Sequence, residues 1–270
     1  MLGSIAKSLR REKFKLVTSF IKLTGIGRYS DLERIKNAHA GKRCFIVCNG
    51  PSLTIEDLEK LHTNNEICFA SNRIDRIYEK TNWRPNYICV MDKGFMSYAK
   101  NIEPDEYCRQ ILDEQLTYCF FEDGMKSLIN GTGIKDDRIL YFRNEFRNGK
   151  DTKLCFSDDI TVRVEDFATV TSTCIQFAVY MGFTEIILLG QDMTFSYYID
   201  LDGKIVNENV KDYFDNENRP VKLQGLTNYK GMITGFETVK KYTDAHGVKV
   251  YNATPGGRLH VFERINLSDI

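Results

Sequence analysis

The stretch "FIVCNGPSL", residues 45–53, joins an apolar run to a loop, and the residues that follow, "TIEDLEKL", have the period of a helix. A strand that ends in a glycine-containing loop and opens a helix is a common place to hold a nucleotide. That helix begins at Thr54 and carries Glu56 and Asp57 in its first turn, a capping arrangement whose carboxylates would repel a phosphate. We therefore expect this loop to contact the nucleoside part of a ligand.

Beyond this loop, apolar and β-branched runs alternate with helical patterns. Strands of nearly continuous apolar character that are separated by helices indicate a mostly parallel sheet covered on both faces. The fold class is therefore α/β, a doubly wound domain with a Rossmann-like sheet. The predicted strands are 43–48, 66–70, 87–91, 116–121, 138–142, 185–189 and 248–251, and the predicted helices are 54–61, 73–81, about 167–181 and 230–245.

One stretch, residues 196–229, interrupts this alternation. It is polar and rich in Asn, Asp and Tyr, and its hydrophobic periodicity is weak. A long irregular insertion in a compact domain is usually a functional lid or a disordered loop. We expect a lid, with short strands at "KIVN" (204–207) and "VKLQ" (221–224).

Composition restricts the class of protein. Lys plus Arg and Asp plus Glu both number 37 in the 270 residues, so no overall charge recruits nucleic acid. Eight cysteines form no CxxC pair, and four of them (44, 48, 68 and 89) lie in apolar runs, which indicates free, buried thiols in a reducing cytoplasm. The sequence shows neither an 18-residue apolar run nor the apolar core of a secretory signal.

The N-terminal segment is basic and amphipathic. Its apolar residues (Ile5, Leu9, Phe14, Leu16, Val17, Phe20, Ile21 and Leu23) lie roughly on one face of a predicted helix over 5–23. Two interpretations fit: a helix packed on the domain with its charges in solvent, or an interfacial helix attracted to anionic lipid. We divide the chain into this segment, 1–41, and a Rossmann-like α/β domain, 42–270, with the lid at about 196–229.

Polar residues follow several of the predicted strands. In open α/β sheets ligands bind at the carboxyl ends of the strands, so these residues mark a candidate site. Each has another explanation as a turn former or helix cap, but their coincidence at successive strand ends favours a site. They are Asn49-Gly50-Pro51-Ser52, Ser71-Asn72-Arg73, Asp92-Lys93 and Gly190-Gln191-Asp192, with Thr169, Thr171, Ser172 and Thr173 at the start of the preceding helix.

Other nucleotide and hydrolase motifs are missing from the sequence. It contains no GxxxxGK[ST], GxGxxG or GxSxG. Of the four histidines, only His260, in "PGGRLHVF", follows a loop of the kind that lines a site.

The order of four segments resembles a known family. "FIVCNGPSL", "ASNR", "VMDK" and "ATVTSTCIQFAVYMGFTEIILLGQDM" are similar to the bacterial lipooligosaccharide sialyltransferases and the related 6-hydroxymethylpterin diphosphokinase-like domain family. That wider group includes motility-accessory glycosyltransferases that modify flagellin. The resemblance covers roughly residues 42–255 and rests mainly on the N-G-P-S-L loop and the block that ends in G-x-D.

The sialyltransferase branch implies a Rossmann-like domain of the GT-A-variant type with a lid, a CMP-activated nonulosonic acid donor, inversion at the anomeric carbon, and no essential metal or cofactor. The acceptor would be a glycan or glycolipid of lipopolysaccharide or capsule biosynthesis. The enzyme would be cytoplasmic and peripheral on the inner membrane through residues 5–23, and either monomeric or homo-oligomeric. The donor-nucleotide residues that the resemblance implies are Asn49, Gly50, Ser52, Asn72, Asp92, Thr169, Thr171, Gly190 and Asp192.

The resemblance also implies catalytic groups. Two tyrosines just past G-x-D stabilise the leaving phosphate in those enzymes; here the first position holds Thr194, and Tyr197 and Tyr198 lie close to the second. The general base there is a lid histidine, but no histidine occurs between His62 and His246. His260 or a lid carboxylate (Asp200, Asp202 or Asp215) would have to replace it.

Two alternatives follow from this departure. One is ATP-dependent pyrophosphoryl transfer to a pterin, with Asp92 and Asp192 as magnesium ligands. The other is a nucleotide- or glycan-binding module that lacks a catalytic base.

Overall fold

The computed structural model describes residues 16–92, 94, 102–146, 155–215 and 226–270. Within them the chain forms one large parallel sheet of eight strands, in the order β13-β12-β8-β1-β2-β3-β4-β5. The strands are β1 (Arg43–Val47), β2 (Cys68–Ser71), β3 (Tyr87–Val90), β4 (Tyr118–Glu122), β5 (Ile139–Phe142), β8 (Glu185–Leu189), β12 (Lys249–Asn252) and β13 (Glu263–Arg264). All neighbouring strands in this sheet pair in parallel.

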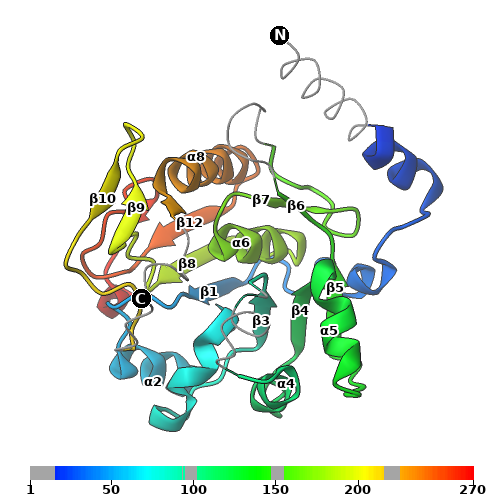
Figure 1. Ribbon diagram of the computed structural model, residues 1–270, viewed down its shortest axis with the longest axis horizontal. Coiled ribbons are helices and arrows are strands. Elements are labelled where there is room, and N and C mark those ends of the chain that lie inside the picture. Colours follow the sequence, from blue (N-terminus) through cyan, green and yellow to red (C-terminus); the bar gives the residue numbers. More distant parts are fainter. Residues whose placement is uncertain (1–15, 93, 95–101, 147–154, 216–225) are drawn as a thin grey trace.

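Helices cover both faces of this sheet, as Figure 1 shows for α6 and α8 on one side and α2 and α4 on the other. Besides a helix over residues 16–24, the chain forms the α-helices α2 (Ile55–Thr63), α4 (Pro104–Ile111), α5 (Lys126–Gly131), α6 (Val170–Tyr180) and α8 (Tyr229–Ala245). Short 3-10 helices are η1 (Ser30–Ile35), η2 (Asn72–Lys80), η3 (Asp123–Met125) and η4 (Leu267–Asp269). The Rossmann-like α/β fold predicted from the sequence is confirmed.

The side chains of β1 point alternately to the two faces of the sheet, and each face has its own apolar core. Phe45 and Val47 join the cluster that contains Leu58 of α2, whereas Cys44 and Ile46 join the cluster that contains Phe177 of α6. Successive side chains of a strand point to opposite faces, so a strand buried on both faces reads as a continuous apolar run. This is why the apolar runs of the sequence located the strands of the sheet.

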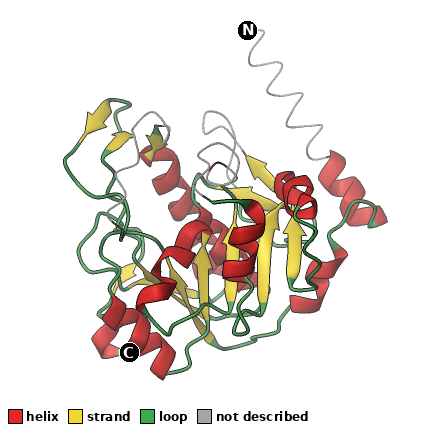
Figure 2. Cartoon of the chain, turned by 60° about the horizontal axis from the view of Figure 1, so that its bottom comes forward, coloured by secondary structure: helices red, strands yellow, loops and turns green. Residues whose placement is uncertain are grey.

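Two smaller sheets lie outside the main one. One contains β10 (Ile205–Asn207), β9 (Tyr197–Ile199) and β11 (Thr227–Asn228), and the other β6 (Asn144–Phe146) and β7 (Val164–Asp166). The first belongs to the predicted lid and stands apart from the main sheet (Figure 2). Its strand β10 confirms the strand expected at "KIVN", while the one expected at "VKLQ" lies outside the described residues.

The remaining predicted features have mixed outcomes. Seven of the eight cysteines are free and buried, as expected for those in the strands. Residues 16–24 form a helix that contacts the domain, as one of the two interpretations expects, but among its apolar side chains Ile21 is the one that is buried there, and Leu16, Val17, Phe20 and Leu23 are exposed. Residues 5–15 lie outside the described part. None of the described helices is long and apolar enough to cross a membrane.

Candidate nucleotide site at the carboxyl edge of the sheet

The loops after β1 and β8 lie side by side at the point where the strand order reverses. From β1 the chain proceeds outward through β2 to β5, and it returns to the other side of β1 with β8. Such a switch point leaves a crevice at the carboxyl ends of the strands. Here Gly50 N donates to Gly190 O at 2.9 Å, which joins the two loops.

Both glycines are required by this close approach. A Cβ on Gly50 would lie 2.0 Å from Asp192 Oδ2 and 2.4 Å from Gly190 O. Gly190 has φ +66°, and a Cβ there would lie 2.6 Å from Cys48 O. Gly50 and Gly190 therefore keep the two loops in contact, whatever ligand they face.

A hydrogen bond between side chains also ties these loops together. Ser52 Oγ donates to Asp192 Oδ2 at 2.8 Å, and Asp192 is 7% exposed. Burial raises the pKa of the Asp192 carboxyl, and the hydrogen bonds from Ser52 act in the opposite sense. The hydrogen bond between Ser52 and Asp192 thus connects the two loops at the switch point, and Thr54, not Ser52, caps α2 by accepting from Asp57 N at 3.1 Å.

Two asparagines follow the neighbouring strands β1 and β2. Asn49 Nδ2 donates to Ser71 O at 3.0 Å, while its Oδ1 is buried and has no partner in the described part of the chain. Asn72 adopts φ +47°, and its Oδ1 accepts from Met91 N at 3.2 Å, so it connects β2 to the end of β3 and does not cap the helix after it. An asparagine tolerates this left-handed conformation better than most residues.

These asparagines line a small pocket, of about 360 Å³ with its solvent-open part included. It lies where β1, β2 and β3 end, and residues of the lid close one side. The lining comprises Asn49, Asn72, Arg73, Arg76, Asp92, Tyr213, Phe214 and Asp215. Of the predicted donor-nucleotide residues, the structure therefore brings Asn49, Asn72 and Asp92 to one pocket.

The lid contributes two polar contacts at this pocket. Phe214 N donates to Asn49 O at 3.0 Å, and Arg76 forms an ion pair with Asp215 at 2.6 Å. Arg73 pairs with the buried Asp75 at 2.9 Å. Two guanidinium groups thus lie beside the amides, which gives the pocket groups that can bind an anion.

The two threonines that begin α6 make internal contacts. Thr169 is the N-cap of α6 and accepts from Thr171 N at 3.3 Å, which matches the alternative reading of this region as a helix cap. Thr171 is buried, and its hydroxyl donates to Gln191 Oε1 at 2.5 Å and lies 3.3 Å from Cys48 Sγ. Thr171 therefore supports the loop after β8, Thr169 caps α6, and neither lines the pocket.

The three predicted catalytic residues do not line this pocket either. Tyr197 and Tyr198 are successive residues of β9, so their side chains point to opposite faces and cannot both meet one phosphate. Tyr198 is buried and packs against Tyr229 of α8, with ring centroids 5.6 Å apart. His260 is exposed on the loop before β13, and not on a helix.

Tyr198 belongs instead to a polar cluster between the lid and the C-terminal loop. Its hydroxyl donates to Glu208 at 2.8 Å and accepts from Arg258 at 3.1 Å, while Arg258 also pairs with Glu208 at 2.6 Å. The hydrogen bond to Glu208 raises the pKa of the Tyr198 phenol, and the one from Arg258 lowers the pKa of Glu208. Arg258 N donates to Asp192 O at 2.7 Å, so this cluster connects the lid to the G-x-D turn.

The sequence did not single out Arg76, Glu208 or Arg258. For Arg76 a signal exists: it lies three residues after Arg73, which places the two arginines on neighbouring positions of one helical surface just after a strand end. Glu208 and Arg258 are 50 residues apart, and no local pattern connects them.

Metal ligands form no cluster in the described residues: no group of three or more His, Cys, Asp or Glu side chains there could hold an ion. The pocket itself contains the carboxylates of Asp92 and Asp215, and Asp92 accepts from Gly94 N at 2.7 Å.

Comparison with known proteins identifies a family. No curated protein matches the chain. The MAf glycosyltransferase from Magnetospirillum magneticum AMB-1 is similar in structure, with a TM-score of 0.49 and 15% sequence identity. The match covers 87% of this chain and 35% of the glycosyltransferase, so this chain spans about a third of the length of that protein. That likeness is too distant to bear on activity. The family model for "6-hydroxymethylpterin diphosphokinase MptE-like" matches residues 19–198, about two thirds of the 270 residues, and the chain therefore belongs to this MptE-like family.

Proposed function

We propose that the protein is an inverting glycosyltransferase that moves a nonulosonic acid from a CMP-activated donor to a glycan or lipid-linked acceptor without a metal. The observation that carries the proposal is the pocket at the ends of β1, β2 and β3, where side-chain amides and guanidinium groups meet. It lies at the edge of the sheet where this fold binds nucleotides, and it includes three of the residues on which the resemblance to the sialyltransferases rests.

Asn49 and Asn72 would read the nucleoside. An amide offers both donors and acceptors, which suits a base edge or a ribose hydroxyl. The buried Oδ1 of Asn49 has no partner in the described residues, and an unpaired buried acceptor costs about 1–3 kcal/mol. The exocyclic amino group of cytosine is a donor that would satisfy it.

Arg76, together with Arg73, would meet the phosphate. Departure of CMP from the sugar builds negative charge on that phosphate, and guanidinium groups stabilise it by charge-assisted hydrogen bonds. This assignment replaces the one made for Tyr197 and Tyr198, because those two side chains lie outside the pocket lining. The donor phosphate would compete with Asp215 for Arg76.

Asp215 is our candidate for the general base that activates the acceptor hydroxyl. Of the three lid carboxylates considered, it is the one in the pocket lining. Asp200 instead accepts hydrogen bonds from Asp202 N and Lys204 N within the turn before β10, so it stabilises that turn. Once a donor phosphate occupied Arg76, the Asp215 carboxylate would be released to accept the acceptor proton.

A second candidate function is ATP-dependent pyrophosphoryl transfer to a pterin, which the name of the matched family favours. That reaction would need magnesium held by carboxylates. Asp92 lines the pocket, but Asp192 does not and already accepts from Ser52, so the expected pair of ligands is not brought together there. A binding module without catalysis is the third candidate.

Donor turnover tests the proposal without knowledge of the acceptor. The purified chain is incubated with a CMP-activated nonulosonic acid in EDTA, and free CMP is followed by mass spectrometry. We expect slow CMP release that Asp215→Asn and Arg76→Gln reduce. Formation of AMP from ATP and a hydroxymethylpterin in magnesium, without CMP release, would establish the second candidate; CMP binding without any release would establish the third.

A further inference from the structure

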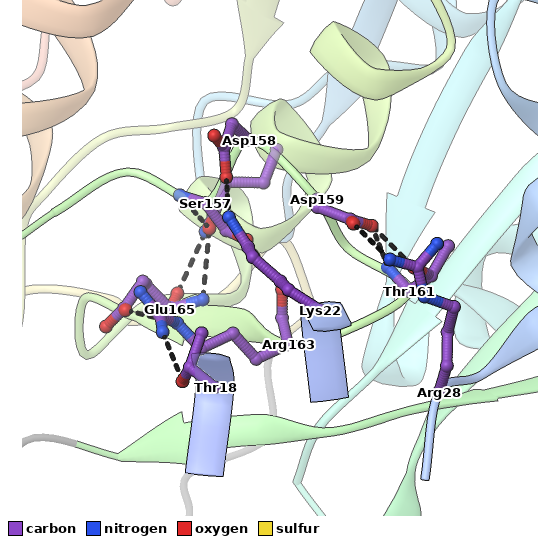
Figure 3. A network of polar contacts seen from close by, with 10 residues as sticks. Thr18, Lys22, Arg28, Ser157, Asp158, Asp159, Thr161, Arg163 and Glu165 are labelled. Atoms are coloured by element: carbon purple, nitrogen blue, oxygen red, sulfur yellow. Dashed lines mark hydrogen bonds and ion pairs between the residues drawn. The ribbon is translucent and has the colours of Figure 1, made fainter. Parts of the chain in front are cut away.

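The helix over residues 16–24 turns polar side chains toward the domain. Thr18 Oγ1 accepts from Arg163 Nη1 at 2.9 Å, and Lys22 pairs with Asp158 at 3.3 Å (Figure 3). One apolar side chain, Ile21, is buried at this contact with 4% exposure. The helix therefore attaches to the domain mainly through polar contacts.

The residues that Thr18 and Lys22 contact belong to a segment with further polar contacts of its own. Arg163 pairs with the buried Glu165 at 2.8 Å, and its carbonyl accepts from Ser157 Oγ at 2.7 Å. Just after the helix, Arg28 pairs with Asp159 at 3.2 Å (Figure 3). Contacts at both the helix and the segment after it fix which face of the helix points outward.

The outward face is apolar. Leu16 is 70% exposed, Val17 44%, Phe20 52% and Leu23 87%. Positions 16, 17, 20 and 23 share one side of a helix, so these side chains form a continuous exposed strip. Ile26, 65% exposed, extends the strip past the helix end. We call these five residues the N-terminal apolar strip; it lies at the margin of the molecule (Figure 1, dark blue).

Positive charge adjoins this strip along the chain. Five basic residues precede it (Lys7, Arg10, Arg11, Lys13 and Lys15), with Glu12 as the one acid among residues 1–15. Lys13 and Lys15 are within three residues of Leu16 in the sequence, so the charge and the strip belong to one continuous segment. An apolar strip beside concentrated positive charge is typical of helices that lie in the interface of an anionic membrane.

We propose that the N-terminal apolar strip inserts into the surface of an anionic lipid membrane and so holds the protein there. The polar contacts of Thr18 and Lys22 would keep the strip facing the bilayer, and the preceding cations would contact lipid headgroups. Membrane binding of this kind does not depend on which group the site at the carboxyl edge of the sheet transfers.

A second copy of the chain is a poorer occupant. A stable protein interface takes roughly 20–30 residues from each side, several times the five of the strip. Pairing two copies through the strip would also bring two basic segments together, which is unfavourable.

The test is co-sedimentation of the full chain with vesicles. One set contains phosphatidylcholine and phosphatidylglycerol, and the other phosphatidylcholine alone. We expect binding to the first set that weakens with added salt, because salt screens the attraction to the headgroups. Phe20→Ser with Leu23→Ser should weaken partitioning at least about tenfold, because two large apolar side chains would no longer enter the bilayer.

Leu201→Ser with Ile205→Ser is the matched control, because these side chains are 51% and 59% exposed elsewhere on the surface. It should bind vesicles like the wild type, and circular dichroism should show that both variants are folded. Equal binding of the Phe20 and Leu23 variant and the wild type, or no binding of the wild type to anionic vesicles, would overturn the proposal. So would a dimer in sedimentation velocity that this variant dissociates, since the occupant would then be a second copy.

Discussion

Replacing Asn49 by alanine should separate ligand binding from stability. The substitution removes one hydrogen bond, from Nδ2 to Ser71 O, and one buried acceptor, Oδ1, that has no partner in the described chain. Loss of a net hydrogen bond costs about 0.5–1.5 kcal/mol, whereas removal of an unpaired buried acceptor relieves about 1–3 kcal/mol. The two effects oppose one another, so we expect the free energy of unfolding to change by between a loss of about 0.5 kcal/mol and a gain of about 2.5 kcal/mol.

CMP binding should suffer more. If the amide of Asn49 reads the base, its loss removes one buried hydrogen bond to the ligand, about 1–3 kcal/mol, which weakens Kd roughly 5- to 150-fold. Isothermal titration calorimetry in EDTA measures Kd, and urea unfolding measures the free energy of unfolding.

Asn86→Ala provides the matched control. Asn86 Oδ1 accepts from Cys68 N at 2.8 Å, at the amino ends of β2 and β3, the edge of the sheet opposite the pocket. This variant should lose stability and keep its affinity for CMP. If Asn49→Ala bound CMP as tightly as the wild type, the assignment of the nucleoside to this pocket would be refuted.

Two further predictions concern the switch point. Gly190→Ala should lower the free energy of unfolding by about 2–4 kcal/mol, because Gly190 has a positive φ and the added Cβ would contact Cys48 O. Gly247→Ala is the control: its φ is +71°, but nothing lies within 4 Å of the added Cβ, so it should cost only about 1 kcal/mol. Equal losses of the two variants in urea unfolding would contradict this prediction. Burial raises the pKa of the Asp192 carboxyl in the folded chain. The ionised carboxylate therefore destabilises the fold above that raised pKa. This penalty disappears as the pH falls toward the pKa of an aspartate in the unfolded chain, about 3.9. Asp192→Asn should therefore gain stability relative to the wild type at pH 7, and the gain should shrink toward pH 4; a gain that grows toward pH 4 would show the opposite sign of shift.

Most of the main sheet could be predicted from the sequence, because its strands are buried on both faces. The apolar runs "RCFIVC" and "EIILL" contain β1 and β8, and the polar residues that follow these two strands lie together at the carboxyl edge of the sheet. Strands β6 and β7 and helices α4 and α5 were not predicted; β6 and β7, for example, are three residues long, too short for a periodic signal.

The contacts that complete the site could not be predicted for a different reason. The ion pair of Arg76 with Asp215 and the cluster of Tyr198, Glu208 and Arg258 join segments that are far apart in the chain. Local periodicity carries no information on such pairs. The same limit applies to the helix over 16–24: its amphipathic pattern was visible, but which face contacts the domain depends on Arg163 and Asp158, over a hundred residues away.

A thermal-shift comparison of nucleotides tests the central claim most directly. The purified chain is heated with CMP, CDP, UDP, GDP or ATP, each in EDTA and in magnesium. A ligand that binds the folded chain at 100 times its Kd stabilises it by about 2.7 kcal/mol. We predict that CMP raises the melting temperature equally in EDTA and in magnesium and that Asn49→Ala abolishes most of this shift. Stabilisation by ATP that requires magnesium, with no effect of CMP, would contradict the account.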